Sequence, residues 1–264
     1  MSFDPGLFQS HFVNLLRTTQ ARGGVAWYLA ALGGKQRVFK KALDPGALDD
    51  LDMDKIEVLL DLVFTARRKL YPALVGMGNT RLREHVKALF SIKQPVLLRL
   101  RSFAGAFAAD PADDRESVKR AAKMRRAAFD FAAEMLHFSA PETYPLMTRW
   151  VWDVATVSGA LRELIRGNEH MREIPLGDTS ETFEAARLWI IERIAEQGIY
   201  RDEHFWVDLV LAQAYSEYLR SMGEGLLTMD FTRGSVEPDE QVKKLLGIEQ
   251  MRRGGRLRVK KEIA

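Results

Sequence analysis

Apolar residues along this chain recur mainly three and four positions apart, which is the spacing of an amphipathic helix. The clearest stripe follows Asp54 and comprises Ile56, Leu59, Leu60, Val63 and Phe64. The same spacing predicts helices over 7–21, 25–32, 148–166, 203–222 and 238–246, and others that begin near Pro95, Lys119 and Ser180. No convincing pair of strands accompanies them. The pattern therefore predicts an all-α fold with roughly nine or ten helices.

Two of these predictions depend on local sequence. Gly33 and Gly34 are expected to end the helix over 25–32, because glycine weakens a helix interior. The segment 148–166 keeps helical spacing, although the alternation at its start, from Thr148 to Val154, would also allow a short strand. We expect a helix there because the later apolar residues continue the helical period.

A chain of 264 residues with 47% apolar residues can bury a substantial core. We expect one multi-helix globular domain over residues 1–250, with a subdomain boundary as an alternative in the loop near 109–114. That loop contains Pro111 among three aspartates. Residues 251–264 form a basic tail that we expect to be mobile.

The composition excludes several kinds of chemistry. The chain has no cysteine, so disulfides, thiolate zinc sites, iron–sulfur clusters and cysteine nucleophiles are absent. Its first residues lack a secretory signal, and no apolar run approaches the roughly 18 residues that a membrane span needs. We expect a protein of the cytoplasm with no transmembrane segment.

The net charge of +3 is unevenly distributed. Residues 252–264 carry six Lys and Arg against one Glu, so the rest of the chain sums to −2. Such a tail can attract an acidic protein or nucleic acid by charge alone, although a solvated terminus explains it equally well.

The stretch from Lys119 to Asp153 combines acidic, aromatic and histidine residues more densely than any other part of the chain. After a long alanine-rich helix, Pro141 and Pro145 form an elbow. The ligand or partner surface that we expect there consists of Tyr144, Arg149, Trp150, Trp152 and Asp153. These residues could line a pocket for a planar ligand or an unstacked base, or the aromatic rings could simply fill the elbow.

A glycine turn between two helices is the second candidate. Leu74-Val75-Gly76-Met77-Gly78, followed by a helix, resembles the turn of helix-hairpin-helix DNA-binding modules. The resemblance implies that Gly76 and Gly78 bring backbone N–H groups close to a phosphate, with positive charge from Arg81 and Arg83. A plain turn between helices is the alternative.

The third candidate is a metal site. Asp130, Glu134 and His137 share one helix face, and Glu-x-x-His is half of the motif used by di-iron helix bundles. The sequence holds no second such pair, so a mononuclear site for iron, manganese or zinc is the metal hypothesis. The alternative is a solvated polar stripe, with Arg126 and Asp130 paired one turn apart.

Two single charges interrupt apolar faces, Arg125 and Asp208. We expect Arg125 at the edge of the core with its charge in water. For Asp208, a buried position with a partner and an edge position remain equally open.

Three hypotheses for function follow. The first is an accessory protein that binds a partner through the elbow and the basic tail. The second is a DNA-binding or glycosylase-like DNA-repair protein that uses the glycine turn for phosphate and the elbow for a base. The third is a metal-dependent helical-bundle enzyme.

Overall fold

The computed structural model describes residues 3–21, 23–108, 110, 114–225, 237–249, 251–252 and 256–257. The described chain is mostly helical, which confirms the all-α prediction. Its α-helices are α1 (Pro5–Gln20), α2 (Val25–Leu43), α3 (Met53–Asp61), α4 (Arg67–Met77), α5 (Asn79–Phe90), α6 (Val96–Gly105), α7 (Arg115–Ser139), α8 (Ser180–Ala195), α9 (Glu203–Gly225) and α10 (Pro238–Leu246). Shorter elements are the 3-10 helices η1 (Leu48–Asp50), η2 (Arg162–Leu164) and η3 (Asn168–His170), and the strands β1 (Met251–Arg252) and β2 (Arg256–Leu257).

The chain divides into two compact units. The terminal unit contains residues 1–35 and 149–264, and the central unit contains residues 36–148. Helix α2 continues from the first into the second. The loop at 109–114 lies within the central unit, and only Asp110 and Asp114 of it are described.

Most of the basic tail lies outside the described residues. Within it, β1 and β2 form an antiparallel pair in which Met251 is opposite Leu257. Among the described residues, no helix combines the length and the apolar character needed to cross a membrane.

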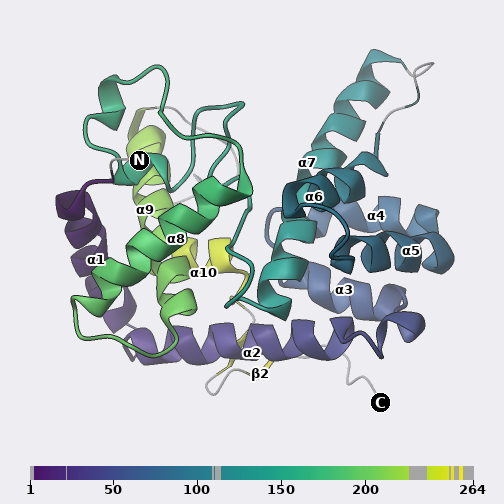
Figure 1. Ribbon diagram of the computed structural model, residues 1–264, viewed down its shortest axis with the longest axis horizontal. Helices are drawn as coiled ribbons and strands as arrows, with labels where there is room; N and C mark the ends of the chain where they lie inside the picture. Colours follow the sequence, from purple (N-terminus) through teal and green to yellow (C-terminus); the bar gives the residue numbers. More distant parts are fainter. Residues whose placement is uncertain are drawn as a thin grey trace. The chain divides into compact units, whose positions relative to one another are not determined.

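Helix α9 is the centre of the terminal unit, where α1, α8 and α10 pack against it (Figure 1). Every residue from Phe205 to Ala214 is buried. The sequence predicted this burial, because that stretch is apolar nearly all round. The one acidic residue inside it, Asp208, is 1% exposed, which decides the open question in favour of a buried position.

Buried polar contacts connect α10 to its neighbours in the terminal unit. The ammonium group of Lys35, which is fully buried, donates a hydrogen bond of 2.7 Å to the carbonyl of Leu246 at the end of α10. A cation is favoured there, because the carbonyl end of a helix is negative. Tyr28 donates to Asp239, and Ser216 of α9 donates to Gln241 at 2.8 Å. These contacts satisfy polar groups that burial would otherwise leave unpaired.

Helix α2 does not end at Gly33 and Gly34, so that prediction is wrong. The helix continues to Leu43, and Leu32 and Phe39 on either side of the glycines are buried. Each glycine costs roughly 1 kcal/mol relative to alanine in a helix interior. Burial of large side chains such as Phe39 contributes about 1.5–3 kcal/mol each, which outweighs that cost.

The segment 148–166 is not a helix, so that prediction is also wrong. It consists of turns, an isolated bridge between Asp153 and Ser158, and η2. The Asp153 carboxylate accepts the N–H of Ala155 at 3.0 Å, which favours a turn over a helix. Val157 at φ 51° and Gly159 at φ 131° then take the backbone out of the helical region.

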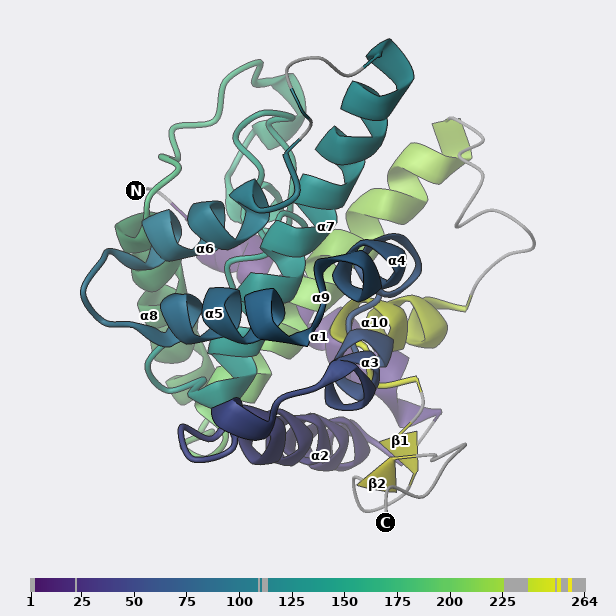
Figure 2. The same ribbon diagram turned by 90° about the vertical axis from the view of Figure 1, so that its right-hand side faces the viewer.

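The central unit is built on α7, against which α4, α5 and α6 pack, while α3 packs on α4 (Figure 2). The second half of α7 is buried and rich in alanine, which allows neighbouring helices to approach closely. The first half is exposed at nearly every position, including Arg125, as expected. The single helix α7 therefore serves both as core and as surface.

Gly159 tests the account of the 148–166 segment. A Cβ there would lie 2.6 Å from the carbonyl oxygen of Val151 at a backbone angle that side chains disfavour. We expect Gly159→Ala to lower the free energy of unfolding by about 3 kcal/mol or more. The matched control is Gly167→Ala, at φ 74° with open space around its Cβ, for which about 1 kcal/mol is expected. Equal losses in urea denaturation would contradict the close approach of the two backbones.

Candidate functional site

The predicted glycine turn exists between α4 and α5. Gly78 lies between the two helices at φ 77° and ψ 159°, a conformation that favours glycine. Its N–H donates to the carbonyls of Leu74 and Val75, each at 3.3 Å, which closes α4. Leu74 and Leu82 are buried on either side and anchor the two helices. Gly76 lies inside α4, so only Gly78 forms the turn.

The turn leaves the N-terminus of α5 exposed. Asn79, Thr80 and Arg81 are exposed, and Gly78 supplies no side chain to cap the helix. The first N–H groups of a helix lack intrahelical partners and carry partial positive charge. No acidic residue lies in this first turn of α5. The arrangement can bind one phosphate oxygen, with Arg81 beside it.

Arg83 has a different place. Its Nε donates a 2.7 Å hydrogen bond to the carbonyl of Leu51, and its side chain is half-buried. This contact holds α5 to the segment after η1. Of the two arginines predicted at the turn, Arg81 is therefore the exposed one, while Arg83 is engaged in the fold.

Contacts of Tyr144 connect the elbow to α6 and α7 within the central unit. The Nδ1 atom of His137 donates to the carbonyl of Tyr144 at 2.8 Å. The guanidinium of Arg99 lies 5.6 Å from the centre of the Tyr144 ring, in cation–π contact. Tyr144 is half-buried by these contacts.

The two tryptophans of the expected surface belong to the core of the terminal unit. Trp150 and Trp152 are each 4% exposed. The Trp150 ring lies 6.1 Å from that of Tyr215 on α9. The half-buried Arg149 and Asp153 approach each other at 3.8 Å. The two indole rings therefore lie in the interior of the terminal unit. Their burial fits the alternative interpretation, in which the aromatic rings fill the elbow.

Asp130, Glu134 and His137 are 0%, 2% and 1% exposed, so the solvated-stripe interpretation is wrong for this part of α7. It holds for the preceding turns, where Lys119, Lys123 and Arg126 are exposed. Among the described residues, no three His, Asp or Glu side chains are arranged to hold a metal ion. The metal hypothesis therefore has no geometric support in the part of the chain that the structure describes.

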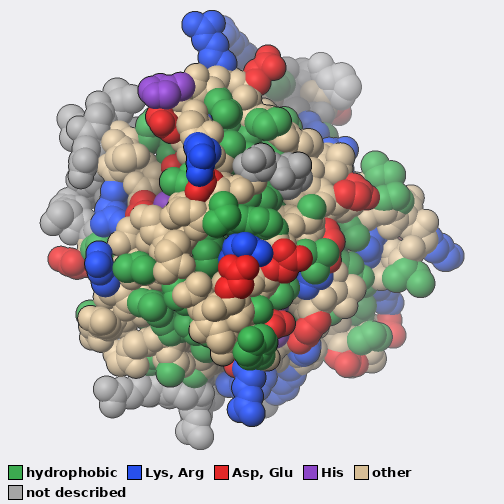
Figure 3. All heavy atoms as spheres, turned by 60° about the vertical axis from the view of Figure 1, so that its left-hand side comes forward, with side chains coloured by type: hydrophobic (Ala, Val, Ile, Leu, Met, Phe, Trp, Pro, Cys, Tyr) green, Lys and Arg blue, Asp and Glu red, His purple; other side chains and the backbone are tan. Residues whose placement is uncertain are grey.

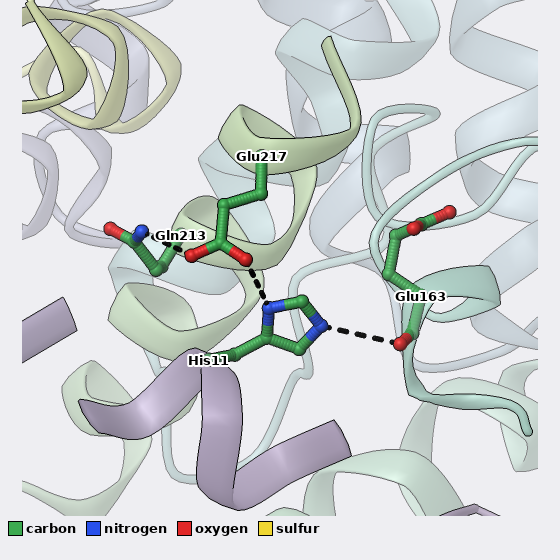
Figure 4. A network of polar contacts seen from close by, with 4 residues as sticks. All are labelled: His11, Glu163, Gln213 and Glu217. Atoms are coloured by element: carbon green, nitrogen blue, oxygen red, sulfur yellow. Dashed lines mark hydrogen bonds and ion pairs between the residues drawn. The ribbon is translucent and has the colours of Figure 1, made fainter. Parts of the chain in front are cut away.

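A polar network that the sequence did not predict joins α1, α9 and η2 (Figure 4). The Nδ1 atom of His11 lies 2.8 Å from Oε2 of Glu217, and its Nε2 lies 3.3 Å from the carbonyl oxygen of Glu163. Gln213 donates to the other oxygen of Glu217 at 2.6 Å. Both ring nitrogens thus face acceptors, and only the protonated imidazolium can donate to both.

Charge and burial shift the pKa values in this network. Burial lowers the pKa of His11, but the hydrogen bond and charge of Glu217 outweigh it, so the net shift is upward. Burial raises the pKa of Glu217, and bonds from His11 and Gln213 outweigh that, so it is lowered. Desolvation keeps the pKa of Glu163 raised, and its carboxylate points away from the imidazole in Figure 4.

The network links distant parts of the chain, because His11 and Glu217 are 206 positions apart. Neither residue stands out from its local pattern, so no local feature of the sequence pointed to the pair. The network consists of polar contacts between helices of the terminal unit. The half-buried Glu217 and the buried His11 form a charge-assisted contact that stabilises the packing of α1 on α9.

Comparison with protein-family models, curated proteins and solved structures found no match. The functional hypotheses therefore depend on the geometry and charge of the chain itself.

The His11–Glu217 contact predicts a pH dependence of stability. Because the folded pKa of His11 is raised, its contribution is complete below 6.5, the ordinary value, and is lost as pH rises through the folded pKa. The contribution of Glu217, whose pKa is lowered, is complete above 4.5 and is lost as pH falls through its folded pKa. We therefore expect the contact to stabilise most between about pH 5 and 6.5.

Replacement of Glu217 should remove most of the slope above that window. In Glu217→Gln, burial lowers the pKa of His11 and only Glu163 still raises it, so stability should change little between pH 6 and 8, where the wild-type protein loses stability. At pH 6 the variant should be about 2 kcal/mol less stable in urea denaturation. Glu57→Gln, at an exposed position on α3, is the control and should leave the profile unchanged. If the stability of Glu217→Gln fell with pH as steeply as that of the wild-type protein, the stabilising role of the His11–Glu217 contact would be excluded.

Proposed function

We propose that this protein binds duplex DNA through its phosphate backbone, with the α4–Gly78–α5 turn as one point of contact. The observation that carries the proposal is the exposed N-terminus of α5, which has no side-chain cap and no acidic residue in its first turn. Helix N-termini of this kind bind phosphate through backbone N–H groups and the helix dipole. Arg81 adds an exposed cation at the same place.

The distribution of charge supports the same proposal. Residues 36–148, the central unit, contain nineteen Lys and Arg against fifteen Asp and Glu, a net charge of +4. The rest of the chain sums to −1, although it includes the basic tail. A local excess of positive charge attracts a polyanion and speeds its association. The excess lies in the unit that carries the turn.

The other hypotheses are less well supported by the geometry. An elbow-mediated partner or base-binding site needs accessible aromatic rings, and Trp150 and Trp152 are buried. We therefore limit the proposal to phosphate binding and do not extend it to base recognition or repair chemistry. The cytoplasmic location that we expect from the sequence belongs to the proposal and is compatible with access to DNA.

Variants at the first turn of α5 test the proposal. Asn79→Asp places a negative charge at the start of the helix, where it should stabilise α5 by about 0.3–1 kcal/mol and repel a phosphate. We expect unchanged or higher thermal stability together with weaker binding. Arg81→Ala should reduce affinity and lower the slope of log affinity against log salt by about 0.9, the value for one phosphate contact.

The measurement is fluorescence anisotropy of a labelled duplex titrated with protein at several salt concentrations. Arg201→Ala is the control, since Arg201 is exposed in the terminal unit and its loss changes the net charge equally. Absence of duplex binding by the wild-type protein at low salt would refute the proposal. Binding that both α5 variants retain in full would exclude the turn as a contact.

A further inference from the structure

The first half of α7, Arg115–Arg126, concentrates positive charge on an exposed helix. We call it the basic half of α7. Within it, Glu116 is the one acidic residue. The six cations are all exposed and are Arg115, Lys119, Arg120, Lys123, Arg125 and Arg126.

Four of these cations form one stripe. Arg115, Lys119, Lys123 and Arg126 are separated by four, four and three residues, which places them within about 80° of one another around the helix axis. A separation of four residues corresponds to a rise of about 6 Å. Each strand of a duplex carries one phosphate per nucleotide, so the backbone is a closely spaced row of negative charges. A row of cations about 6 Å apart along a helix can therefore neutralise several phosphates at once.

The protein itself neutralises little of this charge. Lys119 pairs with Glu116 at 2.8 Å, but both side chains are more than half exposed, and such pairs are weak. Arg120 donates to the neutral Ser117 hydroxyl and also interacts with the exposed Asp114 carboxylate. For Lys123, Arg125 and Arg126, the structure records no acidic partner among the residues it describes. Most of the basic half thus keeps its full charge.

This arrangement disfavours the isolated helix. Like charges one turn apart repel each other, although Asp114 and Glu116 suit the N-terminal end of the helix. Little packing offsets that cost, because Ala121 is the one buried residue from Arg115 to Arg126. In Figures 1 and 2 this end of α7 extends beyond α6. A bound polyanion would remove this repulsion.

The side chains of the basic half favour nucleic acid over other acidic partners. Protein interfaces depend on buried aromatic or large apolar anchors, and amphipathic membrane helices need an apolar face. The basic half has no aromatic residue, and Val118 and Met124 are its large apolar residues. On the face drawn in Figure 3, acidic and basic side chains lie intermixed.

We infer that the basic half of α7 is a second phosphate-backbone contact for duplex DNA, separate from the α4–Gly78–α5 turn. The identity of the ligand rests on the proposed function, whereas the location of this contact does not depend on the turn. The contact is electrostatic and independent of base sequence, because its residues are point charges along an exposed helix.

The test is the triple variant Lys119→Gln, Lys123→Gln and Arg126→Gln. Removal of three phosphate contacts should lower the slope of log affinity against log salt by about 2.7 and weaken duplex binding about tenfold or more at low salt. Thermal stability should stay equal or increase, because repulsion within α7 is relieved. The control triple is Arg17→Gln, Arg172→Gln and Arg201→Gln, at exposed positions in the terminal unit.

The outcomes separate the two proposals. A triple variant with the wild-type slope, or a control triple with the same loss, overturns the α7 contact even if Arg81→Ala weakens binding. Loss in the α7 triple with wild-type binding by both Arg81→Ala and Asn79→Asp supports the α7 contact and overturns the turn. A wild-type protein that binds anionic lipid vesicles or an acidic peptide, but not the duplex, overturns both as DNA contacts.

Discussion

Burial of α9 on every side is the constraint on which the terminal unit depends. Ten consecutive residues of α9, Phe205–Ala214, are buried, and α1, α8 and α10 surround them. A helix enclosed in this way requires partners for any polar group that it carries inward. The polar contacts of the unit accordingly gather around α9: Gln213 donates to Glu217, Glu217 pairs with His11, and Ser216 donates to Gln241. Packing thus determines where the charged and polar groups of this unit lie.

The central unit uses α7 in a different way. One stripe along this helix is cationic and exposed up to Arg126, and from Asp130 onward the same stripe is buried. The alanine-rich second half supports neighbouring helices, and the first half remains unsupported. The features from which we infer DNA binding, an uncapped helix start at Gly78 and repelling cations on α7, are both locally unfavourable. Locally unfavourable features on a compact unit are consistent with binding surfaces, because a bound partner would supply the stabilisation.

Much of the fold could be predicted because local periodicity reports which face of a segment is buried. The helices α1 and α10 follow their apolar stripes closely, α9 follows a segment that is apolar nearly all round, and the turn at Gly78 was predicted from its glycine. The prediction failed at 148–166, where buried residues at helical spacing belong to a series of turns. Spacing records burial, and an irregular segment folded onto a core can bury residues at the same intervals as a helix. The turn geometry at Gly159 depends on its approach to Val151, which is a tertiary contact.

By itself, the sequence determined the all-α class, most helix positions, the absence of thiol chemistry and the glycine turn, because these follow from composition and short-range spacing. The tertiary structure alone decided that Trp150 and Trp152 are core residues and that Asp130, Glu134 and His137 are buried while Lys119 and Arg126 are exposed. It also paired His11 with Glu217. The spacing of polar residues along a helix does not depend on whether water or another segment covers them. The segments that cover a helix come from distant parts of the sequence. Only the folded chain therefore shows which polar residues are buried and which are exposed.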